Sequence, residues 1–306
     1  MKYFLVIFLS IISFENYAQT NQKSNIENIK KHLSIITKTE KPRNFKNLET
    51  LNFVANYIKL ELNKVCDSVE FQNFNVDGNE YKNVIGTIGL EHQQRIIIGA
   101  HYDVCGDSDG ADDNASGVVG LLELARLLSK EKLNYRVDFV AYSLEEPPFF
   151  RTKKMGSYVH ANYLYKNKIP VKGMISLETI GFYSDKVGSQ KFPIAGMEKI
   201  YGNVGNFITV VQNNKNESFS NEVNSLMKRE NLINTKSFKG NSQISGVDFS
   251  DHLNYWKHNF EAVMITNTAF FRNENYHTSK DKLETLDLVK MNLVIKQLYN
   301  VIKKIE

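Results

Sequence analysis

Cysteine is scarce in this 306-residue sequence, which has only Cys66 and Cys105. Neither lies near the apolar N-terminal segment, so a lipoprotein anchor there is excluded. The net charge is only +4 and the basic residues are scattered among acidic ones, so the basic stripe typical of nucleic-acid binding is absent. Internal repeats and low-complexity linkers are also absent. With 42% hydrophobic and 24% charged residues, the composition is that of an ordinary globular protein.

The first 18 residues have the pattern of a secretory signal peptide. Lys2 supplies the positive charge, residues 3–12 form the apolar core, and Ala18 is the expected last residue before cleavage. An uncleaved membrane anchor is the alternative, but the apolar run is shorter than the roughly 20 residues that a spanning helix needs. We therefore expect export to the periplasm or the medium, with one catalytic domain over residues 19–306.

Beyond this segment, apolar runs of strand length alternate with stretches of helical periodicity. The predicted strands cover residues 71–76, 81–90, 95–101, 135–143, 171–177, 206–211 and 261–266. The predicted helices cover residues 25–66, with a break near Pro42, and residues 115–130, 154–167, 220–230 and 286–305. Asp77-Gly78, between the first two strands, predicts a hairpin. The alternation predicts an α/β fold with a mostly parallel, mixed central sheet flanked by helices on both faces.

Polar side chains follow the ends of several predicted strands, where parallel sheets place their ligand sites. His101 and Asp103 end the strand over residues 95–101, and an Asp-Asp pair lies in the motif Gly-Ala-Asp-Asp-Asn-Ala-Ser-Gly at residues 110–117. Imidazole and carboxylate groups are typical zinc ligands. The set predicts a two-metal site with one glutamate left over as a base. Its remaining members are Glu145, Glu146, Glu178 and His277.

The positions of these residues favour particular roles. Asp103 could orient the ring of His101. Either Asp112 or Asp113 could bridge two metals about 3.5–4 Å apart, and the residues alone do not separate the two or exclude simple helix capping. Adjacent glutamates in a strand point to opposite sides, so one could bind metal while the other accepts a proton from metal-bound water. The phenol of Tyr276 could donate to a developing oxyanion.

Two segments invite a serine-hydrolase interpretation, which their context disfavours. Ser108 lies in a Gly-x-Ser-x-Gly pattern, but it falls mid-loop rather than between a strand and a helix. The run Ser250-Asp251-His252 is no evidence for a triad, because a triad is defined by spatial arrangement and not by adjacency in sequence.

The motifs together resemble the secreted dinuclear-zinc aminopeptidases of metallopeptidase family 28. The resemblance runs from about residue 95 to residue 287 and rests on six ordered motifs, at residues 99–103, 110–117, 145–150, 176–178, 250–252 and 276–278. It implies a zinc-exopeptidase fold of the phosphorylase/hydrolase-like type. It also implies peptide substrates with a free N-terminus, two Zn²⁺ ions, and no stable membrane association after signal removal.

The resemblance also implies which residues bind metal. His101 and Glu178 would bind one zinc, Glu146 and His277 would bind the other, and Asp113 would bridge the two. Many members of the family carry Asp where this chain has Glu178, so this ligand departs from the common pattern.

The catalytic roles are implied in the same way. Glu145 would be the general base, Asp103 would orient His101, and Tyr276 would polarise the substrate carbonyl. A cis peptide bond is expected after Asp113.

Some alternatives remain open from the sequence. A single-zinc glutaminyl cyclase or a non-catalytic binding domain could share the fold. Cys66 and Cys105 could form a disulfide, could both be free, or could leave Cys105 near the site. Ordinary core packing competes with a pocket-lining role for the aromatic residues Phe149, Phe150, Trp256, Phe270 and Phe271.

Overall fold

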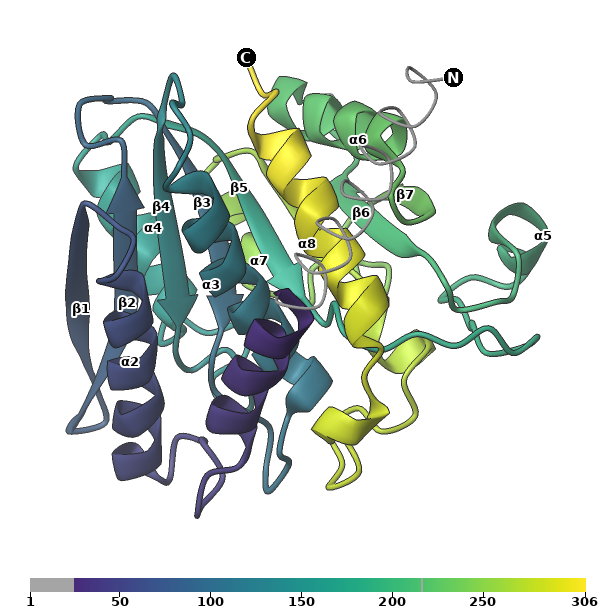
Figure 1. Ribbon diagram of the computed structural model, residues 1–306, viewed down its shortest axis with the longest axis horizontal. Coiled ribbons are helices and arrows are strands. Elements are labelled where there is room, and N and C mark those ends of the chain that lie inside the picture. Colours follow the sequence, from purple (N-terminus) through teal and green to yellow (C-terminus); the bar gives the residue numbers. More distant parts are fainter. Residues whose placement is uncertain (1–24, 216) are drawn as a thin grey trace, which may run out of the picture.

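The computed structural model describes residues 25–215 and 217–306. The predicted signal peptide, residues 1–18, lies outside these described residues. Eight strands form one sheet, in the order β1-β2-β4-β3-β5-β8-β6-β7. Their bounds are β1 Ser68–Val76, β2 Asn79–Ile88, β3 Arg95–His101, β4 Arg136–Tyr142, β5 Val171–Glu178, β6 Ile208–Asn213, β7 Thr235–Gly240 and β8 Ala262–Thr266. The predicted α/β fold with a mixed central sheet is confirmed (Figure 1).

The four central strands, β4, β3, β5 and β8, run parallel to one another. They are buried along almost their whole length, because helices cover both faces of the sheet and apolar side chains are needed on both. β2 pairs antiparallel with β4 on one flank, and β6 pairs antiparallel with β8 on the other. The carboxyl ends of the central strands therefore meet at one edge, where a ligand site is expected.

Two layers of helices enclose the sheet. Figure 1 shows α2, α3 and α8 in front of it, and α4 and α7 lie behind. Successive side chains of β3 divide between the layers: Ile96 and Ile98 join the larger apolar core, and Ile97 joins the smaller one under α4 and α7. The front layer consists of residues 25–37, α2 Leu48–Leu62, α3 Gly117–Leu128, α6 Ser218–Glu230 and α8 Leu288–Ile302; the back layer consists of α4 Gly156–Lys166 and α7 His252–Lys257.

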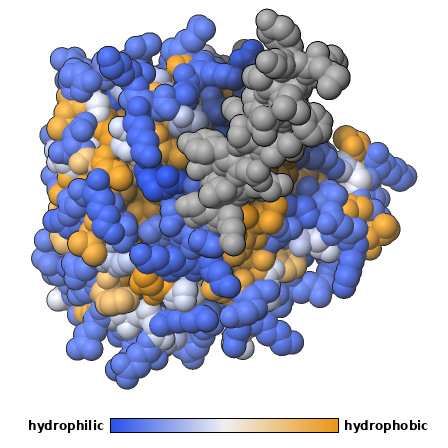
Figure 2. All heavy atoms as spheres, in the orientation of Figure 1, coloured by the Kyte–Doolittle hydropathy of each residue, from blue (hydrophilic) through white to orange (hydrophobic). Residues whose placement is uncertain are grey.

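The surface drawn in Figure 2 is mostly hydrophilic, with apolar side chains exposed in small groups. The short helix α5, Glu198–Tyr201, projects beyond the β7 edge of the sheet (Figure 1). Within residues 25–215 and 217–306, no helix combines the length and the apolar character that crossing a bilayer requires.

The predicted hairpin is confirmed, because β1 and β2 pair antiparallel across a turn at Asp77 and Gly78. These residues have φ angles of 52° and 85°, the left-handed conformation that such two-residue turns require. The sequence patterns miss β7 and α7. β7 is an edge strand with two lysines among its six residues, and α7 has only six residues, so neither shows a sustained apolar period.

Candidate metal centre

The predicted ligands come together at the carboxyl edge of the central strands, although they belong to five separate segments. His101 ends β3, Glu178 ends β5, and Glu145 and Glu146 follow β4. Asp113 lies at a non-helical kink within Ala111–Ser116, just before α3, and His277 lies in a loop after β8.

Asp113 lies between the two imidazole rings. Its Oδ1 is 3.3 Å from His101 Nε2, and its Oδ2 is 3.0 Å from His277 Nε2. Glu178 Oε2 lies 3.4 Å from the same His101 nitrogen, and Glu146 Oε2 lies 3.2 Å from the His277 nitrogen. We refer to His101 with Glu178 as the His101 side and to His277 with Glu146 as the His277 side. Asp113 is shared, so its carboxylate is placed to bridge two cations.

The structure separates Asp113 from Asp112, which the sequence does not. The Asp112 carboxylate accepts hydrogen bonds from the backbone N–H groups of residues 181 and 182 and from the side-chain amides of Asn267 and Asn273. The Asp112 carboxylate therefore connects the segments around residues 181 and 270, and its oxygens already have hydrogen-bond donors. Asp113 Oδ2, by contrast, is buried without a hydrogen-bond donor. Asp113 is thus the aspartate available to a metal.

Asp103 contacts both the His101 ring and the backbone of Glu145 and Glu146. His101 Nδ1 lies 3.2 Å from the backbone carbonyl oxygen of Asp103, which can only accept, so Nδ1 carries the proton and Nε2 faces Asp113. The Asp103 carboxylate lies at 3.6 Å from Nδ1 and accepts the backbone N–H groups of Glu145 and Glu146. The expected orienting role thus falls mainly to the Asp103 carbonyl, while its side chain positions the two glutamates.

Asp281 and Ser250 support the ligands from behind. Asp281 accepts the backbone N–H groups of Asp112 and Asp113 at 2.9 and 3.0 Å. Ser250 donates to Glu178 Oε2 at 2.7 Å. Hydrogen-bonded partners of this kind orient metal ligands and tune their basicity. Sequence reasoning gave Asp281 no role, because its partners are backbone groups far away along the chain.

Arg43 anchors the loop between β3 and Asp113, and sequence reasoning missed it as well. Its buried guanidinium donates through Nε to the Tyr102 carbonyl at 2.8 Å and through Nη2 to the Gly110 carbonyl at 2.6 Å, and Nη1 donates to the Asp109 carbonyl. These bonds connect the segment after the first helix to both ends of the loop over residues 102–110. Its only sequence signal is a position beside Pro42.

Four buried carboxylates and two imidazoles share one region, in which His101 is buried and His277 is partly exposed. Burial raises the pKa of Glu145 well above its ordinary value, against the opposing effect of His101 and with Glu146 and Glu178 adding to the rise. Burial likewise raises the pKa of Glu146 to about 8. Burial also disfavours the charged form of Asp113, but the two imidazoles hold its pKa below the ordinary value. The excess of acidic groups is a charge imbalance that bound cations would relieve.

The backbone beside the ligands adopts conformations that ordinary residues rarely adopt. Leu144, just before the glutamate pair, has a φ of 61°, Thr179, just after Glu178, has 51°, and His277 itself has 58°. Such left-handed conformations persist only where the surroundings enforce them, and they cluster at functional sites.

The geometry gives the serine-hydrolase alternatives no support. Ser108 donates to a backbone carbonyl, and Ser250 donates to Glu178. The His252 ring contacts the Val247 carbonyl oxygen through Nε2 at 2.8 Å instead of a serine. Among the described residues, neither serine is therefore paired with an imidazole base.

Comparison with known families identifies the family of the chain. Residues 83–302 match the family described as Peptidase family M28. The chain belongs to this family. As the resemblance implies, the peptide bond between Asp113 and Asn114 is cis.

This M28 chain is similar in sequence to an Escherichia coli protein, and its fold is similar to that of both an aminopeptidase and a glutaminyl cyclase. "Uncharacterized protein YfbL" of Escherichia coli (strain K12) is 41% identical over 284 residues, which cover 90% of this chain and 87% of that protein. The fold is similar to that of LapA aminopeptidase from Legionella pneumophila, with a TM-score of 0.73, 20% identity, and coverage of 95% of this chain and 76% of LapA. It is also similar to a Bacteroides thetaiotaomicron glutaminyl cyclase bound to N-acetylhistamine, with a TM-score of 0.65, 19% identity, and coverage of 93% and 98%. At these identities the two structures establish the fold alone.

An apolar cavity adjoins the candidate metal centre of this M28 chain. Glu178 and Tyr276 belong both to its wall and to the predicted site, and Phe270 and Phe271 line it too. Residues near α5, among them Phe192, contribute a further wall. Of the five aromatic residues expected to line a pocket, Phe270 and Phe271 do so. The remaining three, Phe149, Phe150 and Trp256, lie elsewhere.

Tyr276 connects this cavity with the His277 side. Its ring stacks on the His277 ring with centroids 3.9 Å apart and planes inclined by 15°. Burial raises the pKa of Tyr276 well above its ordinary value, and Asp113 and Glu146 add to the rise. The phenol therefore stays protonated at neutral pH and can donate a hydrogen bond.

Proposed function

We propose that this chain is a zinc aminopeptidase, which hydrolyses the first peptide bond of peptides with a free N-terminus. The observation that carries the proposal is the position of Asp113, whose two oxygens each face a different imidazole and carboxylate set. Membership of the M28 peptidases supports hydrolysis of a peptide bond. The fold similarity to LapA aminopeptidase supports action at the N-terminus.

The donor set fits two zinc ions. We propose that His101, Asp113 and Glu178 bind one and that Asp113, Glu146 and His277 bind the other, since these are ordinary zinc donors. Asp113 Oδ2 and Glu146 Oε1 are buried without hydrogen-bond donors, a costly state that a cation relieves. When bound, the metal supplies a coordinated water whose pKa lies near neutrality.

Glu145 is the residue that we assign to proton transfer. Its Oε2 lies 3.9 Å from His101 Nε2, farther than the nearest oxygens of Asp113 and Glu178, so it borders the His101 side without being its closest partner. From there the carboxylate can accept a proton from the attacking water and return it to the leaving amine. Its raised pKa in the metal-free protein would fall beside a cation, toward the range a base needs.

Tyr276 and the apolar cavity support a particular position for the substrate. The phenol of Tyr276 can donate to the oxygen of the attacked carbonyl, where negative charge develops. The cavity beside it, walled by Phe270 and Phe271, is placed to receive the side chain of the first residue. We therefore propose that large apolar N-terminal residues are preferred, because burying their side chains there removes apolar surface from water.

A panel of aminoacyl-nitroanilides, assayed with and without a chelator, tests this proposal. We expect release from free-amine substrates only, loss of release on chelation, and loss in Glu145→Ala at unchanged zinc content. Glu284→Ala is the matched control, since the Glu284 side chain is 67% exposed, and it should keep full activity. No release from any substrate by the fully metallated enzyme would sink the aminopeptidase proposal.

A single-zinc glutaminyl cyclase is the second candidate, favoured by the fold similarity over 98% of the Bacteroides thetaiotaomicron enzyme. A cyclase would bind one zinc per chain and would release ammonia from an N-terminal glutamine without releasing nitroaniline. Zinc counting together with an N-terminal glutamine cyclisation assay therefore separates the two activities.

We further propose that the enzyme acts outside the cytoplasm. The support is the signal-peptide pattern of residues 1–18 alone. N-terminal sequencing of protein recovered from the periplasm or medium should begin at Gln19, whereas a chain that keeps Met1 would contradict cleavage at Ala18.

A further inference from the structure

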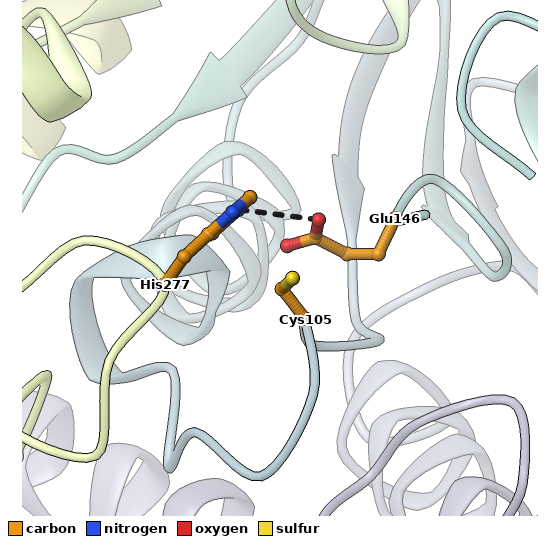
Figure 3. Close-up of side chains that lie close together, drawn as sticks. All are labelled: Cys105, Glu146 and His277. Atoms are coloured by element: carbon orange, nitrogen blue, oxygen red, sulfur yellow. Dashed lines mark ion pairs between the residues drawn. The ribbon is translucent and has the colours of Figure 1, made fainter. Parts of the chain in front are cut away.

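Cys105 lies in the loop after β3 and faces the His277 side of the metal centre. Figure 3 shows its thiol directed toward the Glu146 carboxylate, and the ring of His277 faces the same carboxylate from the other side. The sulfur, a carboxylate oxygen of Glu146 and a ring nitrogen of His277 all lie within 4.8 Å of one another. Cys105 forms no disulfide. Three potential metal donors from three separate segments thus converge on one place.

A second observation at the same place points to a cation. Glu146 is only 4% exposed, and its Oε1 has no hydrogen-bond donor. Asp113, 3% exposed, has an Oδ2 in the same state. The Oε2 of Glu146 and the Oδ2 of Asp113 lie 3.2 and 3.0 Å from His277 Nε2. Buried carboxylate oxygens without donors cost free energy unless a cation binds them, so this group is built to hold one.

We propose that the thiolate of Cys105 is a ligand of the cation on the His277 side. That cation then has four protein donors, namely the sulfur of Cys105, the Nε2 of His277, and oxygens of Glu146 and Asp113. Formation of the metal–sulfur bond displaces the thiol proton, which leaves to solvent. This inference rests on the metal centre of the proposed function, but it concerns coordination and can be measured without turnover.

A sulfur donor makes the two sides chemically unequal. The candidate donors on the His101 side among the described residues are nitrogen and oxygen atoms, with no sulfur. Thiolate ligands favour zinc and softer cations over manganese or magnesium, so the His277 side should select its metal more strictly. Four protein ligands are typical of a closed site, whereas three leave a position for water. The His277 side should therefore retain its cation more tightly, and the His101 side should carry the reacting water.

Cys66 provides a matched control within the same chain. It is also unpaired, but it packs beside Leu62 and Gly86, away from every ligand group found among the described residues. Replacing Cys66 removes one thiol and leaves the metal centre unchanged.

Absorption spectroscopy of the full chain loaded with two Co²⁺ ions tests the proposal. A thiolate bound to Co²⁺ gives a sulfur-to-metal charge-transfer band in the near ultraviolet. We expect this band in the wild type and in Cys66→Ala and its loss in Cys105→Ala, while the visible ligand-field bands persist. Zinc competition should show that Cys105→Ala weakens the tighter site by at least the roughly 10-fold that even outer partners of a metal ligand contribute.

Thiol titration of the wild type keeps the test decisive if Cys105→Ala fails to fold. An aromatic disulfide reagent should modify Cys105 in the chelator-treated protein and should leave it unmodified when zinc is bound. Equal modification in both states, no charge-transfer band at two Co²⁺ per chain, or a band that survives in Cys105→Ala would each overturn the proposal. A charge-transfer band without peptide hydrolysis would support Cys105 as a ligand and contradict the proposed aminopeptidase activity. Peptide hydrolysis without the band would support the activity and contradict Cys105 as a ligand.

Discussion

His101 and His277 both face Asp113, yet the chain holds the two rings differently. The His101 side chain is 1% exposed and ends a central strand, as Glu178 does. The His277 side chain is 29% exposed and belongs to a loop, and Glu146 lies beyond the end of β4. The His101 side is therefore part of the sheet edge itself, whereas the His277 side depends on how loops fold over that edge.

The contrast bears on how the site assembles. Groups on strands and helices are held more accurately than groups on loops. We therefore expect the His101 side to keep its geometry in the metal-free protein and the His277 side to be completed when its cation binds. Asp113 belongs to both sides, so each variant described below either breaks the shared element or separates one side from the other.

Replacing Asp113 should have the largest effect, because it breaks both sides at once. We expect Asp113→Asn to lower peptidase activity by about 10³-fold or more, since metal ions supply several kcal/mol of charge stabilisation in such reactions. Metal analysis should show zinc lost from both sides. Asp107→Asn, an exposed change in the same loop, should keep activity and zinc. An Asp113→Asn protein that keeps two zinc ions and full activity would show that Asp113 is not a metal ligand.

The two histidines should differ in what they contribute to metal-free stability. Burial lowers the pKa of His101, but Glu145 and Glu178 raise it well above the ordinary value, so removing the ring leaves these buried carboxyl groups without their partner. His101→Ala should therefore cost about 3–5 kcal/mol of unfolding free energy in chelator. Burial lowers the pKa of His277, but hydrogen bonds to Asp113 and Glu146 raise it to about 11. His277→Ala should still cost less than His101→Ala, about 1–3 kcal/mol, because the ring is partly exposed to water while its carboxylate partners are buried. Urea denaturation measures both, and equal losses would contradict the contrast.

The strand ends that carry the His101 side can be located from the sequence. His101 and Glu178 come at the ends of continuous apolar strands, and the end of an unbroken apolar run locates such residues closely. The choice between Asp112 and Asp113 cannot be made locally, because it depends on amides such as that of Asn267, 155 positions later. The strands of the sheet could be predicted for the same reason, because each strand has its own apolar run in the sequence.

Arg43 and Cys105 show why other parts of the site could not be predicted. Arg43 acts through backbone carbonyls, three of them in the loop after β3 and one at Ile36, and a backbone carbonyl is present at every position of any sequence. Cys105 is only four positions from His101, yet its direction toward His277 depends on how that loop turns. Local patterns predict where elements begin and end, but contacts made across loops need the folded chain.

The supporting residues allow a finer separation of the two sides. Ser250 donates to Glu178 and so supports the His101 side, whereas Asp281 holds the backbone of the shared Asp113. Ser250→Ala should weaken zinc binding on the His101 side by roughly 10-fold, and Asp281→Asn should weaken both sides by roughly 10- to 100-fold. Competition with a chromophoric chelator resolves the two affinities. A Ser250→Ala protein weakened on the His277 side instead would contradict this arrangement.

The smallest expected effect arises in the scaffold beneath both sides. His160 of α4 contacts the Tyr255 hydroxyl at 2.7 Å, and Tyr255 contacts the Tyr142 hydroxyl at the end of β4 at 2.6 Å. Burial lowers the pKa of His160 to about 4, against the opposing effect of Asp138. An imidazole in the unfolded chain titrates near 6.5, so the unfolded state takes the proton first as the pH falls. Stability is therefore lost as the pH falls from about 6.5 to about 4, and this residue has no effect above that range.

Between pH 7 and pH 5.5, His160 alone should lower the unfolding free energy by about 1 kcal/mol. Other buried groups titrate in the same range, so the quantity to measure is a difference. The wild type should lose about 1 kcal/mol more than His160→Gln, which lacks the titrating ring but can still bond to Tyr255. A variant whose stability falls as steeply as that of the wild type would show that the folded protein accepts a proton at His160. The layer under β4 would then accommodate a charged imidazole, which would weaken the argument that the His101 side is rigid.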